Sequence, residues 1–150
     1  MYGHAQEYED VHALSRTLTI TRTQPSTRGG RWRGMQRSPL DFERLDVYRC
    51  AIDFLALAAR ITAHMPRGHS DLRDQLRRAS SSVPLNIAEA CGKTGRADRA
   101  NFHAIARGSA LECAAILDVL VRFGAVSQED VEQGKSLLSR VVAMLSKMCR

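Results

Sequence analysis

The residues with the clearest chemical potential are cations in the middle of the chain. Arginine presents a planar, permanently charged fork that fits a phosphate group, and lysine adds a compact point charge. Arg73 and Arg77 are one helical turn apart. The other candidates cluster a short distance downstream: Lys93, Arg96, Arg99 and Arg107. We interpret these six side chains as a candidate phosphate-contacting surface.

A second interpretation of the same cations stays open. Nearby acidic residues can balance them and leave an ordinary solvated face: Asp71, Asp74 and Asp98. No aromatic side chain is interleaved with the arginines, although proteins that bind single strands use such rings to stack on bases. Any phosphate contact is therefore expected to be independent of base sequence and sensitive to salt.

Polar residues also occur where a helix is expected to be apolar. At about 100° per residue, the stretch over about residues 70–91 places its polar residues within a sector of about 80°. This polar stripe lies beside the apolar stripe of the same stretch and not opposite it. A charge near a core must be paired, because its desolvation is otherwise uncompensated. We therefore expect a polar network, inside the fold or between protomers, made of Gln75, Arg78, Asn86, Glu89, Ser109 and Glu112. Such a network can fix helix register or hold a ligand, and a third interpretation is that its side chains simply reach solvent.

Residues that converge for catalysis or metal binding are not found in the sequence. Glu89 and Glu112 resemble the carboxylates of di-iron bundles, but neither begins the Glu-x-x-His motif that such sites need. The five histidines lack a second ligand at helical spacing. Gly92-Lys93-Thr94 lacks the glycine spacing of a phosphate-binding loop. The sequence predicts no enzyme, no metal site and no cofactor.

Four amphipathic stretches must position these residues. The apolar spacing and the end signals predict helices from Ser38-Pro39 to about residue 63, and over about 70–91, 96–123 and 127–148. Pro84 lies inside the second stretch and predicts a kink there. Connections of a few residues make successive helices antiparallel. The sequence therefore predicts an all-α fold, an antiparallel up-down-up-down four-helix bundle over residues 38–150.

Composition limits the class of protein. Apolar residues make up 44% of the 150 residues and aromatic residues only 5%, which favours close-packed helices. The net charge of +6 is compatible with a polyanionic partner but does not require one. The four cysteines form no Cys-x-x-Cys pair, and no apolar leader or membrane-length segment occurs. We expect free thiols, a cytoplasmic location and no membrane contact.

The first 37 residues differ from the remainder. They have no helical apolar stripe and are rich in Thr, Arg, Gly and Ser, so we expect a disordered basic extension over residues 1–37. Two interpretations compete for this segment. It is either a basic arm that contacts phosphates or an upstream addition that is not native, with Met35 as the genuine start.

One run of residues resembles a known family. The sequence Gln75-Leu76-Arg77-Arg78-Ala79-Ser80, continued by Val83-Pro84-Leu85-Asn86-Ile87-Ala88-Glu89, is similar to the signature of four-helix-bundle proteins associated with intervening sequences in bacterial 23S ribosomal RNA genes. Supporting matches are Leu45-Asp46-Val47-Tyr48 and Ala106-Arg107-Gly108-Ser109 with Glu112. The family usually has glycine where this chain has Ala90, so the second helix is expected to run slightly further.

The resemblance implies a ring-shaped homo-oligomer, typically a pentamer. Related bundles are accessory proteins of diversity-generating retroelements, in which a basic surface is thought to contact nucleic acid and a reverse transcriptase. We therefore expect a non-catalytic bundle that associates with itself and binds structured RNA or DNA through backbone electrostatics. The alternative is a scaffold that binds a partner protein and makes no contact with nucleic acid.

Overall fold

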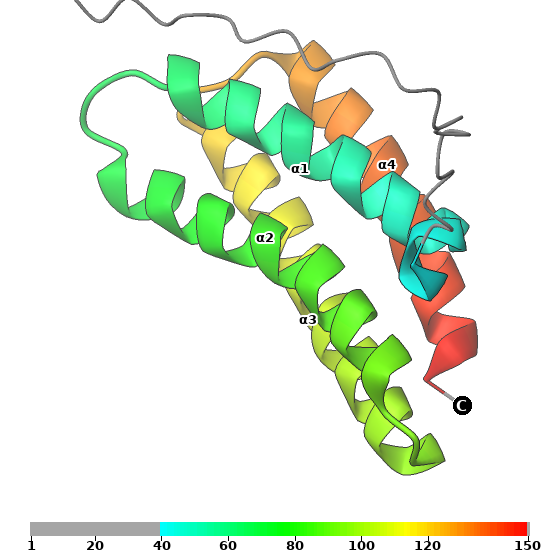
Figure 1. Ribbon diagram of the computed structural model, residues 1–150. Helices are drawn as coiled ribbons and strands as arrows, with labels where there is room; N and C mark the ends of the chain where they lie inside the picture. Colours follow the sequence, from blue (N-terminus) through cyan, green and yellow to red (C-terminus); the bar gives the residue numbers. More distant parts are fainter. Residues whose placement is uncertain (1–39, 150) are drawn as a thin grey trace, which may run out of the picture. The chain divides into compact units, whose positions relative to one another are not determined.

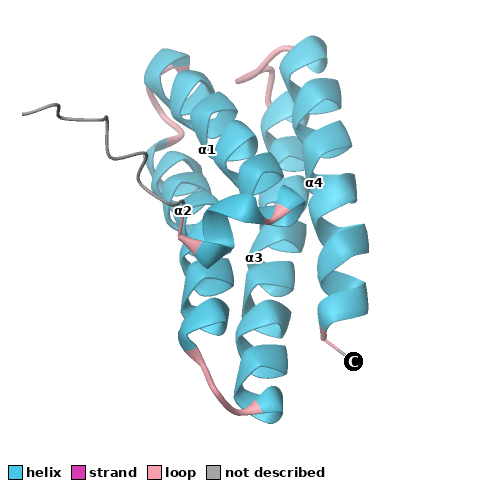
Figure 2. Cartoon of the chain, turned by 45° about the vertical axis from the view of Figure 1, so that its right-hand side comes forward, coloured by secondary structure: helices cyan, strands magenta, loops and turns pink. Residues whose placement is uncertain are grey.

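The computed structural model describes residues 40–149, which form helices joined by short connections (Figure 1). The elements in order are η1 (Asp41–Arg44), α1 (Asp46–His64), α2 (Ser70–Gly92), α3 (Arg96–Arg122) and α4 (Gln128–Met148). Within residues 40–149 there is no strand (Figure 2). The predicted all-α class is confirmed. The N-terminal extension predicted over residues 1–37 lies outside the described residues.

The helices pack in the order of the sequence, and the last returns to the first. α2 contacts both α1 and α3, and α4 contacts both α3 and α1. Consecutive helices run in opposite directions (Figure 1), which confirms the predicted antiparallel bundle. The bundle consequently has two ends. We call the end with residues 65–69 and 123–127 the loop end, and the end with residues 93–95, η1 and the last turn of α4 the turn end.

The first helix begins later than the sequence predicts. Leu45 has an extended backbone, with φ −76° and ψ 126°, so η1 is a separate 3-10 turn and α1 starts at Asp46. The Leu40 N–H donates to the Glu43 carboxylate at 2.8 Å, which closes this short turn locally. The ring of Phe42 meets that of Tyr48 edge-on, with centroids 4.8 Å apart. The proposed cap at Ser38 and Pro39 lies outside the described residues.

The ends of the other helices follow the sequence signals. α2 continues without a break through the buried Pro84 and past Ala90 to Gly92, as the substitution at Ala90 predicts. α3 ends just before Gly124, whose φ of 66° lies in the left-handed region that glycine tolerates. α4 begins where the Ser127 hydroxyl accepts a hydrogen bond from the Asp130 N–H at 3.1 Å.

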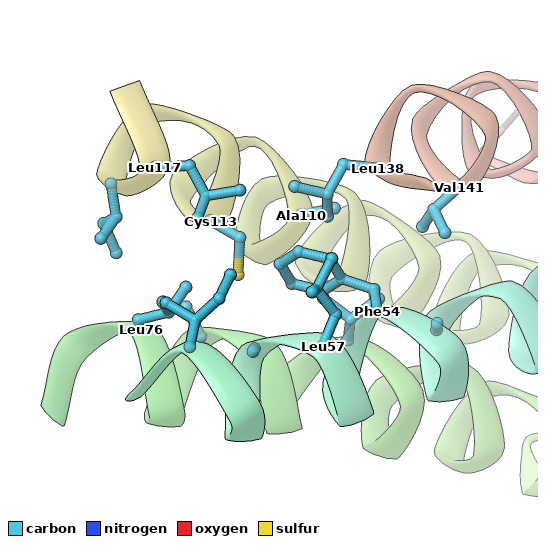
Figure 3. Packing of buried hydrophobic residues seen from close by; sticks show 14 of the residues in the cluster. Phe54, Leu57, Leu76, Ala110, Cys113, Leu117, Leu138 and Val141 are labelled. Atoms are coloured by element: carbon cyan, nitrogen blue, oxygen red, sulfur yellow. The ribbon is translucent and has the colours of Figure 1, made fainter. Parts of the chain in front are cut away.

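The core is formed by aliphatic residues from all four helices around one aromatic ring. Phe54 of α1 is fully buried among residues of the facing helices (Figure 3). Burying one such side chain stabilises the fold by about 1.5–3 kcal/mol. The other large side chains that are almost completely buried include Leu76, Ile87, Leu117, Leu120, Leu138 and Leu145. This core fixes which face of each helix is left for function.

α4 approaches the core closely because it carries Gly134. A Cβ at this position would lie 2.8 Å from Leu117 Cδ1 and 3.5 Å from Phe54 Cε2. A larger residue would therefore overpack the core and push α4 outward.

No helix in residues 40–149 is both long enough and apolar enough to cross a membrane.

Candidate functional site

Arg73 is an internal clamp of the loop end and not a free cation. Its Nη2 atom donates to the carbonyl oxygens of Met65 and Pro66, at 3.0 and 3.2 Å. The side chain is half-buried, and its Nε has no hydrogen-bond partner among the described residues. The guanidinium therefore holds the connection between α1 and α2, and a phosphate-contacting surface that Arg73 shares with Arg77 stays a prediction.

Arg77 and Arg78 line a groove between α1 and α2. The groove has a volume of about 750 Å³, and its opposite wall is formed by Leu55, Ala59 and Ala63. Both arginines are exposed, and neither guanidinium group has a hydrogen bond or ion pair within residues 40–149. The structure therefore places Arg78 beside Arg77 at this groove and outside the polar network predicted for it.

Other side chains at the loop end also have partners within the bundle. Arg60 Nη2 donates to Asp130 Oδ1 at 3.0 Å and to Gln133 Oε1 at 3.2 Å. Hydrogen bonds from Ser127 and then from Arg60 lower the pKa of the Asp130 carboxyl below its ordinary value. The ring of His69 stacks on that of Phe123, with centroids 5.6 Å apart. This end holds its two connections through paired polar groups and a ring contact.

At the turn end, two of the predicted cations are engaged. Lys93 forms an ion pair with Glu89, and its Nζ lies 4.8 Å from the centroid of the Phe102 ring. Arg107 Nε donates to the Ser146 hydroxyl of α4 at 2.9 Å. These contacts do not prevent exposure, but they fix both side chains in place. Lys93 and Arg107 would have to give up these contacts to bind a phosphate, and their place in the phosphate-contacting surface stays a prediction.

Arg96 and Arg99 are exposed side chains on the first turns of α3. Neither guanidinium group makes a hydrogen bond or ion pair with another residue in the described part of the chain. Both line a cavity of about 380 Å³ with His103 of the same helix. Positions 96, 99 and 103 lie on one helical face, since steps of three and four residues bring side chains together. That spacing is visible in the sequence, but His103 was not among the residues predicted for this surface.

His103 is the most enclosed polar group of this cavity. Its side chain is only 6% exposed, and Nδ1 lies 3.3 Å from the Met148 carbonyl oxygen at the end of α4. The other ring nitrogen, Nε2, is buried and has no hydrogen-bond partner among residues 40–149. Such orphaned nitrogens are uncommon, because an unpaired buried polar group costs about 1–3 kcal/mol.

The predicted polar network separates into pairs along the seam between α2 and α3. Gln75 Nε2 donates to Glu112 Oε1 at 3.1 Å, and both residues are exposed. One turn or more away, the Ser82 and Ser109 hydroxyls lie 2.9 Å apart, and Asn86 Nδ2 donates to the Ser82 carbonyl at 2.8 Å. An interior network of Arg78, Asn86, Glu89 and Glu112 is therefore not present in the bundle, because the stripe lies at the edge of the α2–α3 contact and reaches solvent. A network between protomers stays a prediction.

The cysteines and carboxylates show no arrangement for chemistry in the described residues. Cys113 is buried in the core, and burial raises the pKa of its thiol to about 12. Cys91 is exposed beside the turn-end cavity, where partial burial raises its thiol pKa to a lesser degree. Residues 40–149 contain no group of three potential metal ligands from His, Cys, Asp and Glu.

Comparisons with known proteins identify a matching family model and a similar solved structure. A family model described as 23S rRNA-intervening sequence protein matches residues 43–147. A crystal structure of a protein of unknown function from the S23 ribosomal protein family of Bacteroides thetaiotaomicron is similar, with a TM-score of 0.65 and 22% sequence identity. The alignment covers 69% of this chain and 98% of that one, and at this identity it shows the fold alone. No curated protein matches the chain.

Proposed function

The chain belongs to the 23S rRNA-intervening sequence protein family, and we propose that it is a non-catalytic, self-associating bundle that binds structured RNA or DNA. In this proposal, binding occurs through backbone phosphates and does not depend on base sequence. The partner and the location in the cytoplasm are parts of the same proposal. The paired polar groups of the loop end hold the fold, and the unpaired arginines provide the contact.

The observation that carries the proposal is that two cavities are each lined by a pair of arginines whose guanidinium groups are unpaired within residues 40–149. The side chains of Arg77, Arg78, Arg96 and Arg99 are exposed and have no hydrogen bond or ion pair within residues 40–149. An arginine that is not already paired offers all its donors to a phosphate. The net charge of +6 adds a long-range attraction for polyanions that salt weakens.

Charge reversal tests the proposal with a matched control. Fluorescence anisotropy would measure the affinity of the full chain for a labelled RNA hairpin and a DNA duplex across a salt series. The Arg96→Glu/Arg99→Glu variant is expected to bind at least tenfold more weakly, because two attractive contacts become repulsive. The control, Arg122→Glu/Arg140→Glu, changes the net charge equally at two other exposed arginines. Equal losses in both variants would contradict a localised surface, and no binding by the unaltered chain would contradict the proposal.

Self-association is supported by an apolar stripe on the outside of α1. Ile52 is 39% exposed, and Ala56, Ala59 and Ala63 are exposed on the same helical face. A closed cyclic assembly would cover this stripe, and the family resemblance points to five copies. Sedimentation analysis is expected to show a ring-sized oligomer that Ile52→Glu dissociates. Ile105→Glu, at a 44% exposed position of α3, is the control. A monomeric wild type would contradict this part.

The second candidate function is a scaffold for a partner protein. The groove between α1 and α2 favours it, because one wall of the groove is apolar and the other carries two arginines. The groove has a volume of about 750 Å³. Such a groove suits an amphipathic helix with acidic residues. Recovery of the same partner after nuclease treatment, with loss of that partner in Ala59→Glu, would support the scaffold. Recovery that disappears with nuclease would support nucleic-acid binding instead.

A further inference from the structure

The cavity at the turn end has the composition of a ligand site. Its volume of about 380 Å³ falls in the range of small-molecule pockets. The apolar part of its lining comes from three helices and the residue before α1: Leu45, Ala90, Ala100 and Met148. Its polar part consists of Cys91, Arg96, Arg99 and His103. Apolar walls with a few polar groups are typical of sites that bind a flat organic group and orient its edge.

The hydrogen bonding of His103 identifies what the pocket lacks. A carbonyl oxygen only accepts, so the contact with Met148 places the proton of the neutral ring on Nδ1. Nε2 is then an acceptor, and no described residue donates to it. The missing partner is therefore an N–H or O–H donor.

The charges at the mouth favour an anion. Arg96 and Arg99 line the cavity, and Gly95 provides no side-chain cap for the start of α3. Two carboxylates are near. The Asp98 carboxylate lies beside Gly95, since a Cβ added to that glycine would be 3.0 Å from it. The charge of Asp41 contributes to the raised pKa of the Cys91 thiol, which places this carboxylate near the cavity as well. Because Asp98 is about 200° around α3 from Arg96, it leaves the arginine face open.

We propose that this cavity binds one unpaired nucleotide of a structured nucleic acid. The phosphate lies on Arg96 and Arg99, and the base contacts the apolar walls. An amino or imino group of its pairing edge donates to His103 Nε2 once a small movement of the lining uncovers this buried atom. In a duplex the pairing edge is covered by the opposite base and the faces of the base by its neighbours, so only an unpaired nucleotide can turn that edge into a pocket. The inference rests on the proposed nucleic-acid binding and adds a preference for bulges or loops.

The test compares two labelled RNA hairpins that differ by one bulged nucleotide. The full chain is expected to bind the bulged hairpin about 5- to 150-fold more tightly, the range that satisfying one unpaired buried polar group supplies. Ala100→Met fills the half-buried lining without changing charge. It is expected to remove the preference and to leave affinity for the fully paired hairpin unchanged. Ala115→Met, at an exposed position further along α3, is the matched control.

A second measurement does not depend on a variant. Cys91 is exposed and lines the cavity, so an occupant is expected to slow its alkylation, read by peptide mass spectrometry. The bulged hairpin should protect Cys91, and the paired hairpin at equal saturation should not.

The outcomes separate this inference from the function on which it rests. Equal affinity for both hairpins overturns the nucleotide pocket and leaves backbone binding intact. No binding to either hairpin overturns both. Free mononucleotides that protect Cys91 as well as the bulged hairpin does would assign the site to small ligands and overturn its place in nucleic-acid recognition.

Discussion

Both ends of the bundle carry arginines, but the arginines differ in whether their side chains have hydrogen-bond partners. At the loop end, Arg73 and Arg60 donate to carbonyl, carboxylate and amide oxygens. At the turn end, Arg96 and Arg99 have no such partners within residues 40–149, and they surround a cavity that contains an orphaned His103 nitrogen. The loop end uses its polar groups to hold connections together. The turn end leaves Arg96 and Arg99 available, while Lys93 and Arg107 are engaged there.

This difference teaches that charge alone does not identify a binding surface. Arg73 and Arg99 are both arginines on helical first turns, yet one is half-buried and the other exposed. A guanidinium already paired with oxygens would have to break those bonds before it met a phosphate. Removal of a loop-end arginine should therefore affect stability, whereas removal of a turn-end arginine should affect binding.

The largest expected effect on stability comes from the clamp at the loop end. Arg73→Ala removes hydrogen bonds to the Met65 and Pro66 carbonyls, and bonds that involve a charged group contribute about 1.5–3 kcal/mol. Thermal or urea unfolding should show a loss of that order. Arg99→Ala is the comparison, with a change within about 0.5 kcal/mol because it has no partner to lose. Equal destabilisation by both substitutions would break the distinction between the ends.

A smaller effect is expected at the start of α4. Ser127→Ala removes an N-cap and should destabilise the fold by about 1 kcal/mol.

The same site predicts a pH dependence. Because the folded pKa of Asp130 is lowered, its contribution to stability is present above the unfolded value near 4 and is lost as the pH falls through the folded value. Urea unfolding should therefore show a wild-type advantage over Asp130→Asn at pH 7 that shrinks toward pH 3. A constant difference across that range would mean that the Asp130 carboxylate is not the stabilising group.

The smallest expected effect is a difference in thiol reactivity with no change in stability. Cys113 is buried in the core with a thiol pKa of about 12, so it carries almost no thiolate at pH 8. Cys91 at the turn end is exposed and should react first with iodoacetamide. Rapid modification of Cys113 in the native protein would show that the core opens more readily than its packing implies.

The helices and their order could be predicted from the sequence because each depends on local spacing. Apolar stripes locate the four helices, Gly124 marks the end of α3, and Ser127 marks the start of α4. The break at Leu45 could not be predicted, because the residues on both sides of it suit a helix and the backbone turn is set by packing of the Phe42 ring on Tyr48.

The site was harder to predict because its residues are defined by partners distant in the sequence. The clamp of Arg73 depends on the path of the chain at Met65 and Pro66. The isolation of Arg78 from Glu112 depends on how α2 is rotated against α3, and Gln75 takes that contact instead. The role of His103 appears only when the end of α4 lies beside it. Spacing within one helix carries none of this information.

The most direct test of the contrast between the ends is the salt dependence of binding to duplex DNA. Each phosphate contact contributes about 0.9 to the slope of log Kobs against log salt concentration. Arg96→Ala/Arg99→Ala is expected to make that slope shallower by about 1.8, while Arg73→Ala leaves it unchanged. An unchanged slope in the double variant, or an equal loss per arginine in Arg73→Ala, would contradict the assignment of the turn end to phosphate contact.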